Sequence, residues 1–344
     1  MANTNNNKKI HRVVPMNHML RHRGDNATTL NKKLNQELAY SYSLIKLSEQ
    51  EIATRAKVFK TFKDAIESEI ECSVESYGSF RTNLMVYDSD LDITILTKGL
   101  DYKREAEDPL SSKPSANKLL TKVNEILNGK NITTGPIVHI KNARCPIIKC
   151  KDSLFQYKID ISVDKYDAID SAKYVISCLR ERPYLRSFLI LIKYFLKRRQ
   201  LSETIRGGLC SYAQFLLVLN FIQLHPLVQS NRISVEDNLG VLFMDFFQLY
   251  GSEFPFDKSV ISVENVGYKP NKEGLINIED PVNPGHNVAF GCTSLHMIKE
   301  IFNYSYKIMS AAFRNKVATN KAIGELWLRI NEKEIRIRKK IKKV

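Results

Sequence analysis

The spacing of apolar residues changes twice along the chain and divides it into three parts. In residues 34–70 the apolar positions recur at helical spacing, which predicts two amphipathic helices. In residues 72–163 apolar and polar positions alternate with a period of two, which predicts a small mixed sheet with one helix near 116–127. Helical spacing returns and dominates residues 168–309, apart from an irregular region with strand-like pieces at 259–263 and 274–278. We therefore predict an α+β unit flanked on both sides by helices.

The composition fits an ordinary globular protein. The chain has 344 residues and 43% of them are hydrophobic, which is enough to bury a real core. No run of about 18 apolar residues occurs, and the first residues lack the apolar segment of a signal peptide. The six cysteines form no Cys-x-x-Cys pair, so we expect reduced thiols and no structural zinc. These features predict a soluble intracellular protein that does not enter a membrane.

The net charge of +15 lies mostly at the two ends of the chain. Residues 1–33 carry seven Lys or Arg against one acid, and residues 333–344 carry seven against one, so the remaining body is close to neutral. Basic segments bind polyanions without reading their sequence, which supports contact with RNA but identifies no reaction. A solubilising or nuclear-targeting role explains each end equally well. We expect a disordered basic arm at 1–33 and a helical basic tail at 313–344.

Carboxylates on two predicted strands are the first candidates for chemistry. In the strand SDLDITIL, Asp90 and Asp92 share one face because side chains alternate with a period of two, and KIDISV places Asp160 in the same way. If these strands are neighbours, three hard oxygen ligands converge, a set that suits two Mg²⁺ or Mn²⁺ ions. Asp90 and Asp92 would hold both ions, and Asp160 would hold the ion at an attacking hydroxyl and help to deprotonate it. Asp-x-Asp alone is more often a solvated strand face.

A Gly-Ser pair upstream makes the pattern specific. Gly78 and Ser79 directly follow the predicted strand SVESY, twelve and eleven residues before Asp90. A glycine lets the backbone approach a triphosphate, and the serine adds a hydroxyl and an amide at a helix start. Gly-Ser, Asp-x-Asp and a later Asp together resemble the nucleotidyltransferase signature of the DNA polymerase β superfamily. That superfamily includes kanamycin nucleotidyltransferases, CCA-adding enzymes, oligoadenylate synthetases and poly(A) polymerases.

The second half of the chain narrows this choice. The stretch LRSFLILIKYFLKRRQLSETIRGGLCSYAQFLLVLNFIQLHP resembles the central helical region of the noncanonical poly(A) and poly(U) polymerases, and NLGVLFMDFFQLYGSEFPFD and IEDPVNPGHNVAF resemble their PAP-associated segment and nucleotide-recognition loop. Over residues 34–309 the chain is most similar to poly(A) polymerases of the TRAMP nuclear surveillance type. This resemblance implies a polymerase-β-like nucleotidyltransferase domain at 67–175, inserted into a mainly helical central PAP-associated domain made of 34–66 and 176–312.

The resemblance also implies roles for individual residues. Lys193 and Lys197 would reach the β- and γ-phosphates of the nucleotide, Ser211 would bond the triphosphate, and Tyr212 would stack on the incoming base. On the residues alone, the two lysines could equally form a solvated helix face, and Tyr212 could belong to the core. The full set of implied nucleotide-binding residues is Gly78, Ser79, Asp167, Lys193, Lys197, Ser211, Tyr212, Asp280, His286 and Asn287.

Three positions depart from the surveillance enzymes. After the third aspartate those enzymes have Asn-Gly, whereas this chain has Asp167-Ala168, and Phe290 stands where an arginine is common. His286 occupies a position that is often Asn in adenylyl-adding relatives and His in uridylyl-adding ones. A histidine can bond uracil and crowd a purine, but the remaining similarity is to the adenylyl enzymes. We therefore predict addition of adenylates from ATP to RNA 3′ ends, with UTP as the alternative.

The resemblance further implies a zinc-knuckle RNA-binding protein and an RNA helicase as partners. It implies a nuclear, or nucleolar, location, and a cytoplasmic one if the chain is a uridylyltransferase. Two other readings compete with a polymerase. A catalytically silent scaffold has no need for the clustered carboxylates that the chain retains. Nucleotidyl transfer to a small molecule is disfavoured by the helical region after Lys193 and by the recognition loop.

Overall fold

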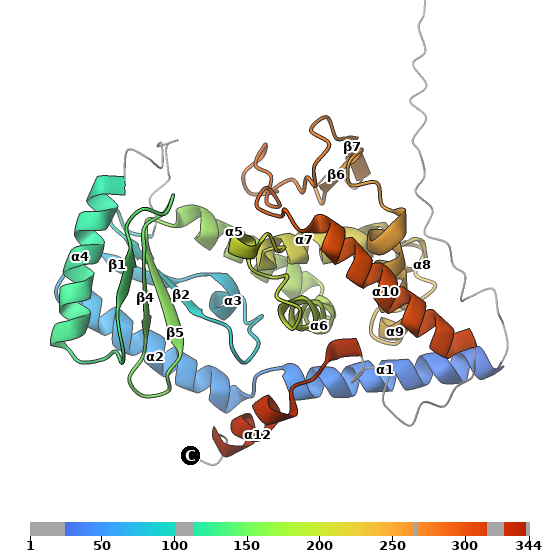
Figure 1. Ribbon diagram of the computed structural model, residues 1–344, viewed down its shortest axis with the longest axis horizontal. Helices are drawn as coiled ribbons and strands as arrows, with labels where there is room; N and C mark the ends of the chain where they lie inside the picture. The colour runs from blue at the N-terminus through green and yellow to red at the C-terminus, as the bar shows by residue number, and fades with distance from the viewer. Residues whose placement is uncertain (1–24, 101–112, 265–266, 315–326, 342–344) are drawn as a thin grey trace, which may run out of the picture.

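The protein has an α+β lobe and a helical lobe that lie side by side (Figure 1). The computed structural model describes residues 25–100, 113–264, 267–314 and 327–341. One core lies between the sheet and the helices that cover it, and a second, larger core fills the helical lobe. Among the described helices, none has the length and apolar character needed to cross a membrane.

The α+β lobe is built on a five-stranded mixed sheet with the strand order β1-β2-β5-β4-β3. β2 and β5 run parallel, and every other neighbouring pair is antiparallel. The alternating pattern predicted this sheet, and its inward positions are fully buried, as Ile93 and Ile161 illustrate. The strands are β1 (Ser73–Ser76), β2 (Leu91–Leu96), β3 (Val138–Ile140), β4 (Ile147–Lys151) and β5 (Lys158–Val163).

Two long helices and one short helix accompany the sheet. α2 (Glu49–Glu67) and α4 (Lys113–Gly129) cover one face and share its core, and α3 (Gly78–Arg81) follows β1 directly. Ser48 caps α2 through a capping box with Glu51, which satisfies the free amides of the first turn.

The helical lobe surrounds a core rich in phenylalanine. Phe188, Phe246 and Phe302 are each 1% exposed or less, and Trp327 packs edge-on against Phe243 at 5.3 Å between ring centroids. Its larger elements are α1 (Asp25–Ile45), α5 (Tyr166–Glu181), α6 (Leu185–Lys197), α7 (Ser211–Leu224), α9 (Leu239–Gln248) and α10 (Leu295–Arg314). Its smaller elements are η1 (Thr204–Arg206), α8 (Pro226–Gln229), η2 (Leu249–Glu253), β6 (Ser259–Ser262), β7 (Gly267–Pro270) and α12 (Glu332–Ile341).

The N-terminal segments differ from the sequence-based expectation in two respects. α1 begins at Asp25, inside the expected disordered arm. Leu34 and Leu38 anchor the helix in the helical core, and each residue added to an existing helix gains a hydrogen bond without the free-energy cost of nucleation. The rest of that arm, residues 1–24, lies outside the described residues. The sequence-based prediction places residues 34–66 as a whole in the helical domain, but α2 packs on the sheet because its Val58 and Phe62 join the sheet core.

Candidate active site

The three predicted catalytic aspartates lie on adjacent strands. β2 pairs with β5 in parallel so that Asp92 is the direct partner of Asp160, and Asp90 precedes β2 by one residue. This pairing confirms that the two strands are neighbours. Side chains at paired positions of adjacent strands point to the same face, so Asp92 and Asp160 lie next to each other. Two carboxyl groups are therefore held close together at this end of the sheet.

Burial and mutual repulsion disfavour the charged forms of these carboxylates. Burial raises the pKa of Asp92 to about 7, and the charges of Asp160 and Asp90 add to the shift. Burial also raises the pKa of Asp90, with Asp160 as the next cause. A cation placed among these groups would reverse both effects, because it stabilises ionised carboxylates.

The donor chemistry of this cluster suits a hard divalent cation. Its candidate ligands are carboxylate oxygens, which Mg²⁺ and Mn²⁺ prefer. Lys149 of β4 stands opposite Asp160 in the sheet and forms an ion pair with its carboxylate. Within the described ranges, no group of three or more His, Cys, Asp or Glu side chains is arranged so that it could hold a metal ion. The arrangement thus offers Asp90 and Asp92 as ready oxygen donors, while Asp160 is partnered by a lysine ammonium.

Gly78 brings the backbone of α3 against the carboxylate of Asp92. Its φ is +61°, in the left-handed region that favours glycine, and a Cβ at this position would overlap the Asp92 side chain. The backbone amide of Tyr77 also donates to the Asp92 carbonyl at 3.0 Å. The Gly-Ser pair is therefore fixed beside the catalytic strand, and Ser79 lines the adjoining cavity.

A cavity of about 790 Å³ lies between the two lobes. It is lined by α3 on one side and by α5, α6, α7 and the loop that contains His286 on the other. The predicted nucleotide-binding residues along its wall are Gly78, Ser79, Asp167, Lys193, Ser211, Tyr212, Asp280 and His286. Polar residues in the same lining that the sequence did not single out are Tyr77, Thr82, Arg144, Tyr166, Asp170, Ser171, Gln214 and Asn283. Arg144 begins the string RCPIIKC, so a family comparison could have found it.

The two predicted phosphate-binding lysines occupy different environments. Lys193 is buried, donates to the Leu84 carbonyl at 3.1 Å and lines the cavity. Burial lowers its pKa to about 8, and Lys197 contributes in the same direction. Lys197 is outside the cavity lining and pairs with the Asp88 carboxylate at 3.0 Å. The structure therefore brings only Lys193 to the cavity wall, although both lysines hold the loop before Asp90.

Tyr212 and the loop that contains His286 form the far wall of the cavity. The Tyr212 hydroxyl donates to Asp280 Oδ1 at 3.0 Å, and its ring lies nearly parallel to Phe215 with centroids 6.3 Å apart. His286 Nδ1 lies 3.5 Å from Asp280 Oδ2, and 56% of the His286 side chain is exposed. Asp280 therefore contacts both residues and holds the Tyr212 ring in place at the cavity wall.

Asn287 takes a different part from the one expected. Its Oδ1 accepts from the amides of Ile278 at 3.1 Å and Ala289 at 2.9 Å, and its Nδ2 donates to the Ile276 carbonyl at 2.9 Å. Asn287 is also outside the cavity lining. Its amide group is occupied by the backbone of its own loop, so it shapes that loop.

Comparisons with known proteins agree with this architecture. A family model described as the central palm domain of mitochondrial-like poly(A) RNA polymerases matches residues 34–178, and one described as Cid1 family poly A polymerase matches residues 238–286. The chain belongs to the noncanonical poly(A) polymerase family. Cid14, a poly(A) RNA polymerase of Schizosaccharomyces pombe, is 30% identical to this family member over 287 residues, covering 80% of this chain and 40% of that protein. The predicted resemblance is thereby confirmed.

Other members of the family differ from this chain in length and in activity. The chain spans less than half the length of the first curated polymerases that it matches. Trf4-2 of Drosophila melanogaster, an inactive noncanonical poly(A) RNA polymerase, is 26% identical over 329 residues, which cover 87% of this chain and 77% of that protein. Membership of the family therefore does not by itself decide whether a chain is active.

Solved structures of the family share the fold. The polymerase core of TRAMP, a complex for RNA surveillance, superimposes with a TM-score of 0.73 at 24% identity and covers 91% of this chain and 98% of its own. The Cid1 poly(U) polymerase superimposes with a TM-score of 0.67 at 19% identity, covering 86% and 98%. Both neighbours have the polymerase-β-like nucleotidyltransferase fold, which confirms the predicted fold class.

Proposed function

We propose that this family member adds nucleotides to RNA 3′ ends without a template, chiefly adenylates from ATP. The observation that carries the proposal is the close packing of Gly78 against Asp92, which joins the aspartate cluster to the cavity between the lobes. A triphosphate in that cavity would have its reacting end beside the carboxylates, with Lys193 in the opposite wall. Its base would lie toward Tyr212 and the loop with His286.

Each group then has a definite task. Asp90, Asp92 and Asp160 would hold two divalent ions, which when bound activate the attacking 3′-hydroxyl and stabilise the departing pyrophosphate. Ser79 would bond the triphosphate. The ammonium of Lys193 would offset the charge that develops on the leaving group. Because it is buried and donates to the Leu84 carbonyl, Lys193 is held in place before the nucleotide enters.

The test is extension of a labelled oligo(A) RNA with Mg²⁺ or Mn²⁺ and each nucleotide supplied separately. We expect a ladder of products with ATP. No extension with any nucleotide, even after addition of a zinc-knuckle RNA-binding protein, would overturn the proposal and favour a silent scaffold, as the inactive relative Trf4-2 illustrates.

Uridylyl transfer is the second candidate function because His286 lines the cavity and is largely exposed. Its imidazole is held by Asp280, so its free ring nitrogen can offer a hydrogen bond to a base edge. A neighbour of the same fold, Cid1, has been solved as a His-to-Asn variant with MgATP bound. This neighbour supports testing the same exchange here.

His286→Asn is expected to raise the ratio of ATP to UTP use by about tenfold, which corresponds to one hydrogen bond of about 1.4 kcal/mol in the transition state. The physical reason is that Asn keeps a polar group but removes the bulk that crowds a purine. Single-nucleotide addition rates with ATP and UTP measure the ratio. His296→Asn, in the first turns of α10 and outside the cavity lining, is the matched control. An unchanged ratio in His286→Asn would remove this residue from base selection.

Two variants of Tyr212 distinguish the contribution of base stacking from that of hydrogen bonding by the hydroxyl. Tyr212→Phe keeps the ring and loses the hydrogen bonds of the hydroxyl, among them the one to Asp280, so we expect the KM for the nucleotide to rise less than about threefold. Tyr212→Ala removes the stacking surface and should raise that KM by about 10-fold or more, since stacking on a base contributes about 1–3 kcal/mol. Equal effects of the two variants in steady-state kinetics would mean that the hydroxyl, not the ring, matters.

The partners and location follow from the same proposal. The structural likeness to the polymerase core of TRAMP, an RNA surveillance complex, supports membership of an RNA surveillance assembly. The zinc-knuckle protein and the helicase in that assembly are partners that the sequence resemblance implies. Such an assembly implies a nuclear location. Co-purification of the tagged chain from a nuclear extract with a zinc-knuckle protein tests this, and a purely cytoplasmic chain would favour the uridylyl alternative.

A further inference from the structure

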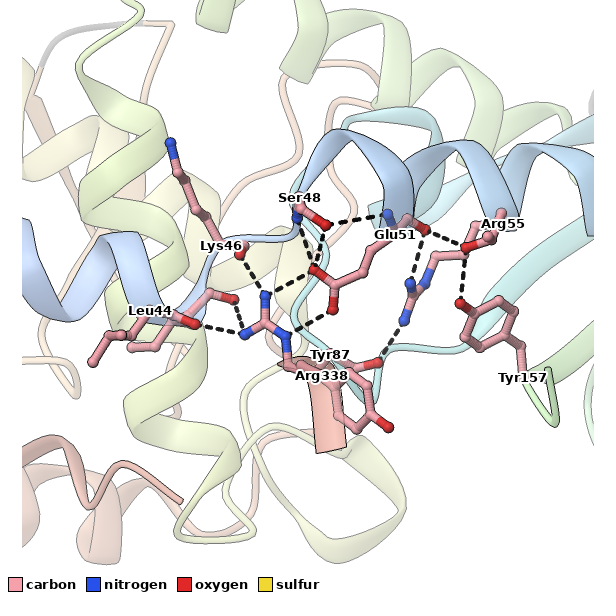
Figure 2. Close-up of polar contacts among 10 residues, drawn as sticks. Leu44, Lys46, Ser48, Glu51, Arg55, Tyr87, Tyr157 and Arg338 are labelled. Atoms are coloured by element: carbon pink, nitrogen blue, oxygen red, sulfur yellow. Dashed lines mark hydrogen bonds and ion pairs between the residues drawn. The ribbon is translucent and has the colours of Figure 1, made fainter. Parts of the chain in front are cut away.

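The basic C-terminal segment, expected to be a tail, contributes a residue to the interior of the molecule. Arg338 of α12 is only 4% exposed and lies at the junction between α1 and α2 (Figure 2). This junction, residues 46–48, is one of the connections between the lobes, because α1 packs in the helical core and α2 in the sheet core. Figure 1 shows α12 beside the point where the two helices meet.

Arg338 holds both sides of this junction with its guanidinium group. Two of its nitrogens, Nη1 and Nη2, donate to the carbonyls of Leu44, Ile45 and Lys46 at 2.6 to 3.2 Å, at the end of α1, where helix carbonyls lack partners. Its Nε and Nη2 also donate to Glu51 at 2.7 and 3.0 Å. These five bonds use all five N–H groups of an arginine, so Arg338 has none left for an RNA phosphate.

Glu51 connects this contact to the start of α2. It is 1% exposed, and one of its oxygens accepts from both the amide and the hydroxyl of Ser48 in the capping box. Burial by itself raises the pKa of Glu51, but the hydrogen bonds from Arg338 and Ser48 outweigh it and leave the pKa below its usual value. The carboxylate is therefore charged, and its charge is matched by Arg338.

The network continues from α2 to the loop that precedes the catalytic strand. Arg55 is fully buried, donates to the Glu51 carbonyl at 3.0 Å and to the Tyr87 carbonyl at 2.6 Å, and lies over the Tyr157 ring. The guanidinium of Arg338 itself lies 5.9 Å from the centroid of the Tyr87 ring. Tyr87 is three residues before Asp90, so the same network that holds the junction also holds the catalytic loop.

The segment before α12 is anchored in the core of the helical lobe. Trp327 and Leu328 are buried in the helical core, and the amide of Asn331 donates to the Tyr194 hydroxyl of α6 at 3.1 Å. The segment 327–341 therefore runs from the helical core to the junction. α6 also holds the catalytic loop directly through Lys193 and Lys197.

We propose that Arg338 is a positioning residue for nucleotide addition, which clamps the junction between the lobes and, through Glu51, Arg55 and Tyr87, sets the position of the loop before Asp90. The kinetic part of this inference rests on the proposed polymerase function. A small displacement of reacting groups lowers the rate even when it starts far from the chemistry. The expected defect is therefore in kcat, because the nucleotide contacts in the cavity are unchanged.

Three variants test the inference. Arg338→Met keeps the length of the side chain but leaves Glu51 buried and unpaired, which destabilises the fold. The double variant Arg338→Met/Glu51→Gln removes that unpaired charge while the introduced glutamine can still cap α2, so its melting temperature should recover toward the wild-type value. Arg336→Met is the control, since Arg336 is exposed and pairs only with Glu332 on its own helix among the ion pairs of the described chain.

We expect kcat to fall about 10-fold in both Arg338 variants while the KM for ATP changes less than about threefold. Hydrogen exchange should be faster at residues 84–90 and 44–51 in these variants and unchanged in Arg336→Met. Recovery of kcat together with stability in the double variant would overturn the proposal, because Arg338 would then be structural only. Hydrogen exchange at the wild-type rate at residues 84–90 in the Arg338 variants would also overturn it. If the wild type extends no RNA, the polymerase function fails, but hydrogen exchange still decides whether Arg338 controls the loop.

Discussion

Asp92→Asn is expected to lower the rate of nucleotide addition by about 1,000-fold, or about 4 kcal/mol of transition-state stabilisation, with the fold intact. Asp92 is the carboxylate that pairs directly with Asp160 and contacts Gly78, so its loss removes a donor from the centre of the cluster. Single-turnover extension of oligo(A) RNA measures the effect. Asp257→Asn, an exposed position in the helical lobe, is the matched control.

The same variant should be more stable than the wild type in metal-free buffer above neutral pH. The pKa of Asp92 is raised from 3.8 to about 7 in the folded state, so the folded protein favours the protonated form and loses stability as the pH rises through this range. Asn carries no charge and avoids that loss, which we expect to amount to about 4 kcal/mol at pH 8 and to fall below about 1 kcal/mol at pH 4. Melting temperatures in EDTA at the two pH values measure it. If the variant were less stable than the wild type at pH 8, burial and repulsion would not destabilise the charged form of Asp92 as we infer.

Gly78→Ala is expected to lower activity by about 100-fold, because its Cβ would overlap the Asp92 carboxylate and displace a group that must be held in position. The variant should also lose about 1–2 kcal/mol of stability, since the φ of +61° is unfavourable for alanine. Extension assays and urea unfolding separate the two effects. The 100-fold loss of activity corresponds to about 2.7 kcal/mol of transition-state stabilisation, which is more than the expected loss of folding free energy.

Gly135 offers a control with the same backbone conformation. Its φ is +69° and its Cβ position has no neighbour within 4 Å, so Gly135→Ala carries the strain of a left-handed alanine without any overlap. We expect it to lose about as much stability as Gly78→Ala and to keep wild-type activity. Equal losses of activity in both variants would mean that backbone strain alone, and not the contact with Asp92, disables the site.

The aspartate cluster favours an enzyme over a simple scaffold. The raised pKa values of Asp90 and Asp92 mean that the fold tolerates unfavourable charges in its interior. Groups that lower stability without packing benefit are typical of functional sites. The inactive relative in the same family makes the activity assay the decisive measurement, with the Asp92→Asn variant as its internal reference.

The local pattern of apolar and polar residues was sufficient to predict those features that depend only on residues close together in sequence. Alternation in residues 91–96 predicted which side chains enter the sheet core, because successive side chains of a strand point to opposite faces. The approach of the Gly78 backbone to a triphosphate stays a prediction, but the structure shows Gly78 in the left-handed conformation with its backbone against Asp92. The family resemblance supplied the fold class and eight of the residues along the cavity wall.

Tertiary structure decided the contacts between distant segments. The pairing of Asp92 with Asp160 joins strands more than sixty residues apart in sequence, and no local period specifies such a partner. Asn287 reads as a ligand residue until its three backbone hydrogen bonds are seen. Arg338 reads as one charge of a basic tail, yet it is buried against Glu51. Sequence pattern was enough to place most of the elements and to name the chemistry of their side chains. Only the folded chain decided which of those side chains meet, because burial and hydrogen bonding depend on segments brought together from far along the sequence.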